Sequence, residues 1–367
     1  MIDKESWVRP DIAAMEAYTP IQPFTVLSER LGLEIDAITK LDANENPYGP
    51  SPHALAAVKT ERWFHIYPDP EAGALREALA NYLDFPAERL LAGMGADELI
   101  DLLLRALLSP GEAVINCPPS FGMYPFSTAV NMGSLISIPR QADFSLNIEA
   151  IETAVAENPR VKVLFVCSPN NPDGSLVKEE DLKELLKLPV LVVLDEAYIE
   201  FAEASGAQSR IRWVLEYDNL VVLRTFSKLA GLAGLRVGYG AFPEWLLPHL
   251  WKIKQPYNVN AAASTAAIAS LNEPAWMQEK VLLIVAERER MVSELRQFEF
   301  LSPYPSRSNF VLFCVTGRSA GQLKTDLAQE GVLVRFFDKP GLNNYIRISA
   351  GRPQDTDRLI AALRKVS

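Results

Sequence analysis

The chain has few of the side chains that build metal centres, disulfide frameworks and histidine-based catalytic sites. Its 367 residues include only three histidines and three cysteines, Cys117, Cys167 and Cys314. The cysteines are far apart and each has apolar neighbours, so we expect buried thiols in a reducing cytosol rather than disulfides or a metal cluster. No histidine lies near another or near a cysteine in the sequence, which argues against a histidine metal site or a Ser-His-Asp triad.

Long apolar runs and clusters of positive charge are also missing. No stretch approaches the roughly 20 apolar residues of a membrane-spanning helix, and the acidic start MIDKESWVRPDIAAMEAY is unlike a secretory signal. Lysine and arginine total 36 against 46 acidic residues, a net charge of −10. We therefore expect a cytoplasmic protein with no membrane or nucleic-acid partner. Hydrophobic residues make up 49% of the chain, which excludes global disorder.

The middle of the chain alternates short β-branched runs with helical patterns. This alternation predicts an α/β fold whose large domain has a mostly parallel mixed sheet covered by helices. Leucines recur at three- and four-residue intervals in 97–108 and 179–188, as they do in amphipathic helices. The predicted strands are Arg89–Ala92, Ala113–Cys117, Leu135–Pro139, Val161–Cys167, Val190–Leu194 and Leu220–Leu223.

After about residue 275 the pattern changes. One long helical stretch leads into NFVLFCV, a helix near 319–330, VLVRFF, YIRISAG and a closing helix, which together indicate a smaller α/β domain. We therefore expect a large domain over 41–274 and a small C-terminal domain over 275–367. The N-terminal segment, 1–40, is expected to pack with the small domain or with a partner subunit.

Polar and glycine residues follow four of the predicted strands. Ligands of open α/β sheets bind outside the carboxyl ends of the strands, so these four clusters should meet at one edge. They would place an amide, a carboxylate, a phenol, a lysine, an arginine and a helix N-terminus around a single pocket. The clusters are Gly93–Asp97, Ser168–Gly174, Asp195–Tyr198 and Arg224–Lys228, the last followed by Arg236.

This set of groups suits pyridoxal 5'-phosphate. That cofactor needs a lysine to form a Schiff base, a carboxylate to keep its ring nitrogen protonated, hydrogen-bonding groups at its phenolic oxygen and an anion site for its phosphate. A carboxylate beside the ring nitrogen favours the charged form of the ring. Helix N-terminal amides with serine and arginine side chains can bind the phosphate.

An ordered set of motifs resembles that of the histidinol-phosphate aminotransferases, which belong to the fold-type-I pyridoxal-phosphate enzymes. The resemblance runs from about residue 18 to the C-terminus. The motifs are LDANENPYGPSP (41–52), HIYPDP (65–70), GMGADELI (93–100), CPPSFGMY (117–124), SPNNPDG (168–174), DEAYIEF (195–201), RTFSKLAGLAGLRVGYG (224–240) and YIRISAG (345–351).

The resemblance implies a role for each matching position. Lys228 would be the Schiff-base lysine that later moves the proton, and Asp195 would pair with the ring nitrogen. Asn171 and Tyr198 would hold the phenolic oxygen, and Phe121 would stack on the ring. The phosphate would be bound by Ala96, Asp97, Ser227 and Arg236, and by Tyr67 from the partner subunit of a homodimer.

For the substrate, the resemblance implies a further set of residues. Arg347 would bind the carboxylate or phosphate, with Arg335 and Tyr18 near it, and Asn44 would lie in the segment that closes over the substrate. The expected reaction is transamination between L-histidinol phosphate and 2-oxoglutarate, giving imidazole-acetol phosphate and L-glutamate in histidine biosynthesis. An arginine fork can bind both anions in turn.

Three positions depart from the family pattern. Asp173 replaces the usual threonine after Asn-Pro, and we expect its carboxylate to point to solvent. Phe121 replaces a tyrosine, which keeps the stacking surface but loses a hydroxyl. Ala17 precedes Tyr18, so the family's common Pro-Tyr pairing is missing there.

The sequence is also compatible with other residue roles and other functions. Tyr67 would be a core residue beside Trp63 and Phe64, and alternation in YIRIS would send Arg347 to solvent. An aromatic amino-acid aminotransferase and a threonine-phosphate decarboxylase share these motifs. A sensor module that holds the cofactor without turnover is a further alternative, although no DNA-binding segment flanks the motifs.

Overall fold

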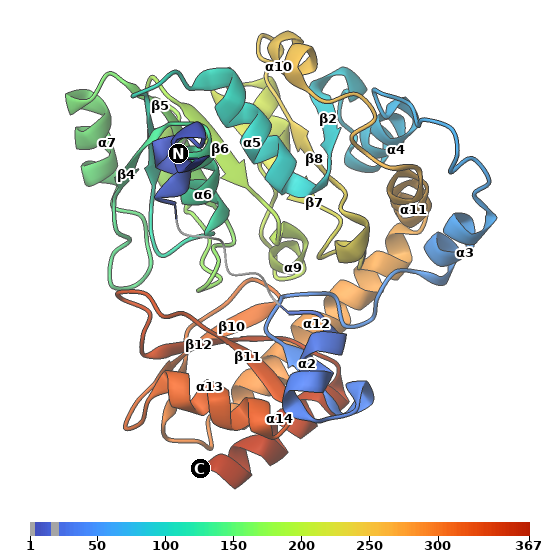
Figure 1. The fold of residues 1–367 in the computed structure, drawn as a ribbon, viewed down its shortest axis with the longest axis vertical. Coiled ribbons are helices and arrows are strands. Elements are labelled where there is room, and N and C mark those ends of the chain that lie inside the picture. Colours follow the sequence, from blue (N-terminus) through green and yellow to red (C-terminus); the bar gives the residue numbers. More distant parts are fainter. Residues whose placement is uncertain (1–3, 16–21) are drawn as a thin grey trace.

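The computed structural model describes residues 4–15 and 22–367 of the chain. Two sheets organise these residues, and each has its own hydrophobic core (Figure 1). The larger sheet has the strand order β2-β8-β7-β6-β5-β3-β4, and the smaller has the order β1-β11-β12-β10-β9. The predicted α/β fold with a mostly parallel mixed sheet is confirmed.

The larger sheet is parallel except for β8, which is antiparallel to both of its neighbours. Strand β2 therefore runs in the same direction as β5, β6 and β7, and the carboxyl ends of these four strands share one edge. Strand β8 was not predicted, because its sequence GYGA contains no β-branched run. The strands are β2 (Leu90–Gly93), β3 (Ala113–Asn116), β4 (Ser134–Ser137), β5 (Val161–Cys167), β6 (Leu191–Asp195), β7 (Leu220–Thr225) and β8 (Gly238–Ala241).

Helices pack on both faces of this sheet, which is why its central strands are apolar on both sides. The core on one face is formed with α5 (Gly95–Leu107), α6 (Met123–Val130) and α10 (Leu247–Ile253). The core on the other face includes α4 (Gly73–Leu83), α7 (Ile148–Glu157), α8 (Glu179–Leu185) and α11 (Ala261–Leu271). The short helices α3 (Pro52–Thr60) and α9 (Ile199–Glu203) complete this part.

The smaller sheet combines C-terminal strands with one strand from early in the chain. Strand β1 (Thr39–Leu41) pairs in parallel with β11, and Leu27 of α2 (Phe24–Leu31) packs with Ile38, Ala328 and Leu333. The short helix α1 (Pro10–Ala13) contacts α6 instead. The other elements are β9 (Leu301–Pro303), β10 (Phe310–Val315), β11 (Val332–Phe336), β12 (Tyr345–Ser349), α13 (Ala320–Gln329) and α14 (Pro353–Val366).

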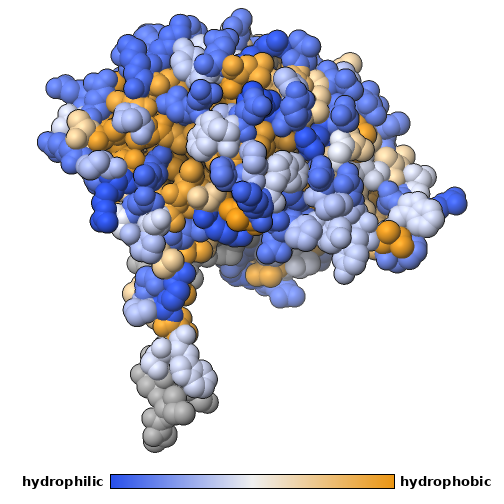
Figure 2. Space-filling model, turned by 90° about the horizontal axis from the view of Figure 1, so that it is seen from above, coloured by the Kyte–Doolittle hydropathy of each residue, from blue (hydrophilic) through white to orange (hydrophobic). Residues whose placement is uncertain are grey.

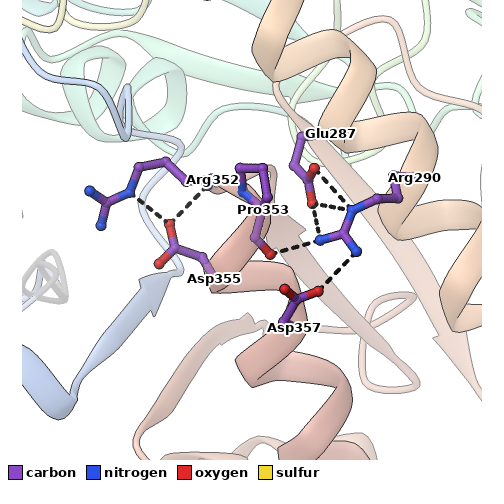
Figure 3. A network of polar contacts seen from close by, with 6 residues as sticks. All are labelled: Glu287, Arg290, Arg352, Pro353, Asp355 and Asp357. Atoms are coloured by element: carbon purple, nitrogen blue, oxygen red, sulfur yellow. Dashed lines mark hydrogen bonds and ion pairs between the residues drawn. The ribbon is translucent and has the colours of Figure 1, made fainter.

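Helix α12 (Pro274–Leu295) belongs to both cores and crosses from one sheet to the other in Figure 1. Met277 and Val281 in its first half are buried in the core of the large sheet, whereas Met291 and Leu295 are buried in the core of the small sheet. Near its end, Arg290 pairs with Glu287 and Asp357 and donates to the Pro353 carbonyl at 2.7 Å (Figure 3). These contacts attach the start of α14 to α12.

Hydrophilic side chains cover most of the face shown in Figure 2, with apolar side chains gathered in patches between them. Within the described residues, no helix is long and apolar enough to cross a membrane. Cys117 and Cys167 are buried as predicted. Cys314 is only half-buried, so that part of the prediction is wrong; it lies on the face of β10 opposite the core residues Phe313 and Val315.

Candidate active site

A cavity of about 370 Å³ opens at the edge where β2, β5, β6 and β7 end. The sheet direction brings together side chains that lie more than a hundred residues apart in the sequence. Nine of the site residues predicted from the sequence line this cavity, together with Gly95: Ala96, Asp97, Phe121, Asn171, Asp195, Tyr198, Ser227, Lys228 and Arg236.

Asp195 ends strand β6 and is almost completely buried. Its Oδ2 accepts a hydrogen bond of 2.7 Å from the Tyr124 hydroxyl, and its Oδ1 accepts one of 3.0 Å from the Ala197 amide. Burial raises the pKa of Asp195 to about 6, although both hydrogen bonds favour the charged form. A cation placed against this carboxylate would offset the cost of burying its charge.

Tyr124 was missed by the sequence reasoning. It lies in the first turn of α6, is fully buried, and stacks on Phe165 with ring centroids 4.5 Å apart. Its position three residues after Phe121 in the CPPSFGMY motif was the available signal. The stacking fixes the ring, so the hydroxyl is held in place to donate to Asp195.

Lys228 follows β7 and extends into the cavity. Its Nζ donates to the Ala43 carbonyl at 3.2 Å and lies 5.8 Å from the centre of the Tyr198 ring. Burial, with a smaller effect from the positive charge of Arg347, lowers the pKa of Lys228 to about 8. The amine is therefore much closer to its neutral, nucleophilic form at neutral pH than an exposed lysine is.

One wall of the cavity is suited to an anion. Helix α5 begins at Gly95, so the amides of Gly95, Ala96 and Asp97 belong to its first turn, where N–H groups have no partner within the helix. Arg236 adopts a left-handed backbone conformation with φ of 56° and donates to Asp97 at 2.9 Å. A Cβ on Gly238 would lie 2.7 Å from the Ala96 nitrogen, so only glycine allows this close approach.

Arg347 joins the small sheet to the cavity. It is buried, contrary to the alternative that alternation sends it to solvent. Its guanidinium donates to Asn171 Oδ1 at 2.6 Å and to the Asp42 carbonyl at 2.7 Å. Arg335 lies opposite Arg347 in the pairing of β11 with β12, and both guanidinium groups lie within 6 Å of the Phe337 ring centre, at 5.7 and 5.6 Å.

Asn44 is buried at the junction of the two sheets and has a positive φ of 54°. Its Nδ2 donates to the Tyr198 hydroxyl at 3.2 Å, and its backbone amide donates to Ser349 Oγ at 2.9 Å. The Asn309 side chain donates to the Asn44 carbonyl at 3.0 Å. The segment that carries Ala43 and Asn44 is thus held over the cavity from both sheets.

Tyr67 does not line this cavity in the described part of the chain. Tyr67 is 79% exposed and stacks on Tyr257 with ring centroids 4.6 Å apart, beside a second cavity of about 350 Å³. The alternative that Tyr67 is a core residue beside Trp63 and Phe64 is wrong, because all three are exposed. Tyr18 lies outside the described residues.

The expectation that Asp173 points to solvent is wrong. The side chain is 2% exposed, and its carboxylate accepts hydrogen bonds from the Asn170 side-chain amide and from the Ser175 backbone amide. The loop after β5 turns back on itself at Gly174, which has a positive φ of 81°. That turn directs the carboxylate inward, which the sequence pattern alone does not reveal.

The chain resembles known proteins over nearly its whole length. The model of the family "Aminotransferase class I and II" matches residues 36–363, so the chain belongs to this family of enzymes. A chloroplastic histidinol-phosphate aminotransferase of Arabidopsis thaliana is 51% identical, covering 98% of this chain and 86% of that protein. A histidinol-phosphate aminotransferase of Roseiflexus castenholzii is 48% identical, covering 98% of both chains.

Solved structures also resemble this chain over nearly its whole length. The crystal structure of histidinol-phosphate aminotransferase from Sinorhizobium meliloti in complex with pyridoxal-5'-phosphate has a TM-score of 0.88 at 27% identity, covering 100% of this chain and 99% of that one. An aspartate aminotransferase variant of Thermus thermophilus, at 19% identity, has a TM-score of 0.80 over 98% of this chain and 99% of that one, and shows the shared fold. The expected enzyme class, an aminotransferase, is confirmed.

Proposed function

We propose that the protein catalyses transamination between L-histidinol phosphate and 2-oxoglutarate with pyridoxal 5'-phosphate as cofactor. The observation that carries this proposal is that Lys228 and buried Asp195 line one cavity and that Arg347 bonds Asn171 in its wall. It is supported by relatives 42–51% identical over 98% of the chain, which are named histidinol-phosphate aminotransferases. The products would be imidazole-acetol phosphate and L-glutamate.

The residues of the cavity fit this cofactor chemically. The start of α5, Ser227 and Arg236 would bind the phosphate, and Asp195 would pair with the ring nitrogen. Phe121 would cover the face of the ring, while Asn171 and Tyr198 would hold the phenolic oxygen. When bound, the cofactor supplies an electron sink for the carbon that loses its proton.

Lys228 would carry the proton during the reaction. A pKa of about 8 leaves a useful fraction of the amine neutral near neutral pH, so it can bond the cofactor and can accept and return a proton. The Ala43 carbonyl, 3.2 Å away, orients the amine toward the cavity. We expect Lys228→Ala to keep the fold but to lose the covalent attachment of the cofactor, as measured by mass spectrometry after borohydride reduction. A retained cofactor adduct in that variant would show that the lysine is misassigned.

Arg347 and Arg335 would bind the substrate anion. Two arginines opposite each other on neighbouring strands can accept a phosphate monoester in one half-reaction and a carboxylate in the other. Asn44 lies in the segment between them and Lys228, where it would close over the substrate. Tyr18 is proposed for the same site on its motif alone.

A substrate panel tests the function. We expect kcat/KM for L-histidinol phosphate, with 2-oxoglutarate as acceptor, to exceed that for phenylalanine by at least about a hundredfold. A preference for phenylalanine would instead identify an aromatic amino-acid aminotransferase. Release of carbon dioxide from threonine phosphate without an oxo acid would identify a decarboxylase, and cofactor binding without turnover a sensor.

We also propose a homodimer in which Tyr67 reaches the phosphate site of the partner subunit. The support is the exposure of Tyr67 together with a neighbouring group of exposed apolar side chains, Trp63, Phe64, Ile66 and Tyr257. Such a group is typical of an interface. Light scattering should give twice the chain mass, and Tyr67→Phe should weaken cofactor affinity; a monomer with full activity would contradict the proposal.

The remaining proposals concern location and domains. A cytoplasmic location is supported by three cysteines without a disulfide among the described residues, while the plant relatives are named as chloroplastic. Cell fractionation tests it. The division into 1–40, 41–274 and 275–367 is supported by the two separate cores, and limited proteolysis between them tests it.

A further inference from the structure

Asp173 is a buried carboxylate immediately beside the candidate active site, but it does not line the cavity. Its Oδ1 accepts from Asn170 Nδ2, and its Oδ2 accepts from the Ser175 amide at 2.9 Å. In the described part of the chain no lysine or arginine pairs with this carboxylate. Burying a carboxylate that is bonded only by neutral donors costs folding free energy. This cost indicates that the position of the Asp173 carboxylate has a role.

Asn170 links Asp173 to a second loop by hydrogen bonds. Its Nδ2 also donates to the Pro119 carbonyl at 3.0 Å, and its Oδ1 accepts from Ser120 Oγ at 3.0 Å. Asn170 therefore connects the loop after β5 to the loop after β3. The residues that follow in the two loops, Asn171 and Phe121, both line the cavity.

The orientation of the Asn170 amide depends on Asp173. A side-chain amide has a donor and an acceptor end of nearly the same shape, and an ionised carboxylate can only accept. Asp173 therefore selects the donor end, which leaves the acceptor end for Ser120. A threonine hydroxyl can donate or accept, so it would not make this selection.

The backbone of the loop reaches the small sheet from the same point. The Gly174 carbonyl accepts from the Arg307 amide at 2.9 Å, and the Gly174 amide donates to the Asn170 carbonyl at 2.7 Å. A Cβ on Gly174 would lie 2.1 Å from Ser306 Oγ, so the two segments are in close contact. The loop is thus fixed at both ends, with the carboxylate of Asp173 between them.

We propose that Asp173 is a positioning residue that, through Asn170, sets the separation of Phe121 and Asn171 and thereby the slot for the cofactor's pyridine ring. The inference rests on the proposed function for its cofactor but not for its substrate. Asp173 touches neither, so its effect should fall on ring binding and spare phosphate binding, which uses α5, Ser227 and Arg236.

The test uses the apoprotein and two probes. 4'-Deoxypyridoxine 5'-phosphate has a methyl group in place of the aldehyde, so it reports on the ring slot without bonding Lys228; inorganic phosphate reports on the phosphate site. We expect Asp173→Asn to weaken binding of the ring probe about tenfold by calorimetry, because the new side-chain amide has only one acceptor, so its donor end must face either Asn170 Nδ2 or the Ser175 amide, both of which are donors. Binding of phosphate, followed by phosphorus NMR, should change by less than about twofold.

Two further variants separate positioning from general loss of structure. Asp143→Asn is the matched control, because Asp143 accepts from the amide two residues ahead at 3.0 Å just as Asp173 does, in an exposed loop. It should bind both probes like the wild type. Ser120→Ala should weaken the ring probe by about threefold, and combined with Asp173→Asn it should add nothing, since the same chain of hydrogen bonds is already broken.

Three results would overturn the inference: unchanged ring binding in Asp173→Asn, equal weakening of both probes, or additive effects of the Asp173 and Ser120 substitutions. Circular dichroism of each variant excludes misfolding as the cause of a loss. If the wild type binds the ring probe but does not transaminate histidinol phosphate, the proposed substrate fails while this inference stands. If the wild type does not bind the ring probe, the proposed cofactor fails and the inference fails with it.

Discussion

Removing the Tyr124 hydroxyl should change the pH dependence of cofactor binding rather than its strength at high pH. In Tyr124→Phe, the buried Asp195 loses a hydrogen bond of 2.7 Å that favours its charged form. A hydrogen bond to a charged group contributes about 2 kcal/mol, which corresponds to about 1.5 pKa units. The pKa of Asp195 should therefore rise from about 6 to a value about 1.5 units higher.

The consequence for binding follows from proton linkage. A ring that carries its proton binds only the ionised carboxylate, so affinity falls below the pKa of Asp195. At about pH 5 the wild type should lose about tenfold in affinity and the variant about three-hundredfold, a difference of about thirtyfold. At about pH 8 both carboxylates are largely ionised, and the two proteins should bind with nearly equal affinity.

Calorimetric titration of both apoproteins with 4'-deoxypyridoxine 5'-phosphate across this pH range measures the ratio of dissociation constants directly. The ionisation of the ligand itself cancels in that ratio. Tyr82→Phe is a matched control, since Tyr82 is a half-buried tyrosine whose pKa is affected by Glu200, Arg224 and Glu203 rather than by Asp195. A ratio that stays constant with pH would refute the reasoning, as would a pH-dependent ratio that persists when Asp195 is replaced by asparagine.

Two other predictions concern stability. Burial raises the pKa of Glu200 to about 7 from its ordinary 4.5, so ionising this carboxyl costs stability as the pH rises through this window. The unfolding free energy of Glu200→Gln should therefore improve relative to that of the wild type by up to about 3 kcal/mol between about pH 5 and 8. A difference that stays constant with pH would contradict this. Gly231→Ala would place a Cβ 2.4 Å from the Gly49 backbone at a positive φ of 69° and should cost more than about 2 kcal/mol. Gly206→Ala, with a positive φ of 89° and no atom within 4 Å, should cost only about 1 kcal/mol in the same denaturant titration, and equal losses would show that strain rather than contact dominates.

The sequence predicted the elements whose patterns are set by burial. Strands such as β5 and β7 are continuous apolar runs because helices cover both faces of the sheet, and a run of that kind is visible in the sequence. Strand β8 was missed because Gly238 and Gly240 are selected for close contact with neighbouring atoms rather than for strand propensity.

Site residues that directly follow a predicted strand could be predicted from the sequence. Site residues whose position depends on contacts between loops could not. Asp195 and Lys228 follow apolar runs, so the sheet direction alone places them together. Asp173 depends on which way a loop turns, which spacing along the chain does not encode. Tyr124 depends on how a helix packs, and its only signal was its place three residues after Phe121. Contacts that need a second subunit, such as the one proposed for Tyr67, are beyond the pattern of a single chain.

Helix α12 limits how the two halves of the molecule can move. Its first turns are anchored among the residues of the large sheet and its last turns among those of the small sheet, with Arg288 buried between them and bonded to the Ser308 carbonyl at 2.8 Å. A continuous helix resists bending, so any rotation of one half against the other must be absorbed elsewhere. The non-helical link through Asp42, Ala43 and Asn44 is another covalent crossing, and it carries the carbonyls that bond Arg347 and Lys228. Rotation of the small half would therefore displace these two side chains first.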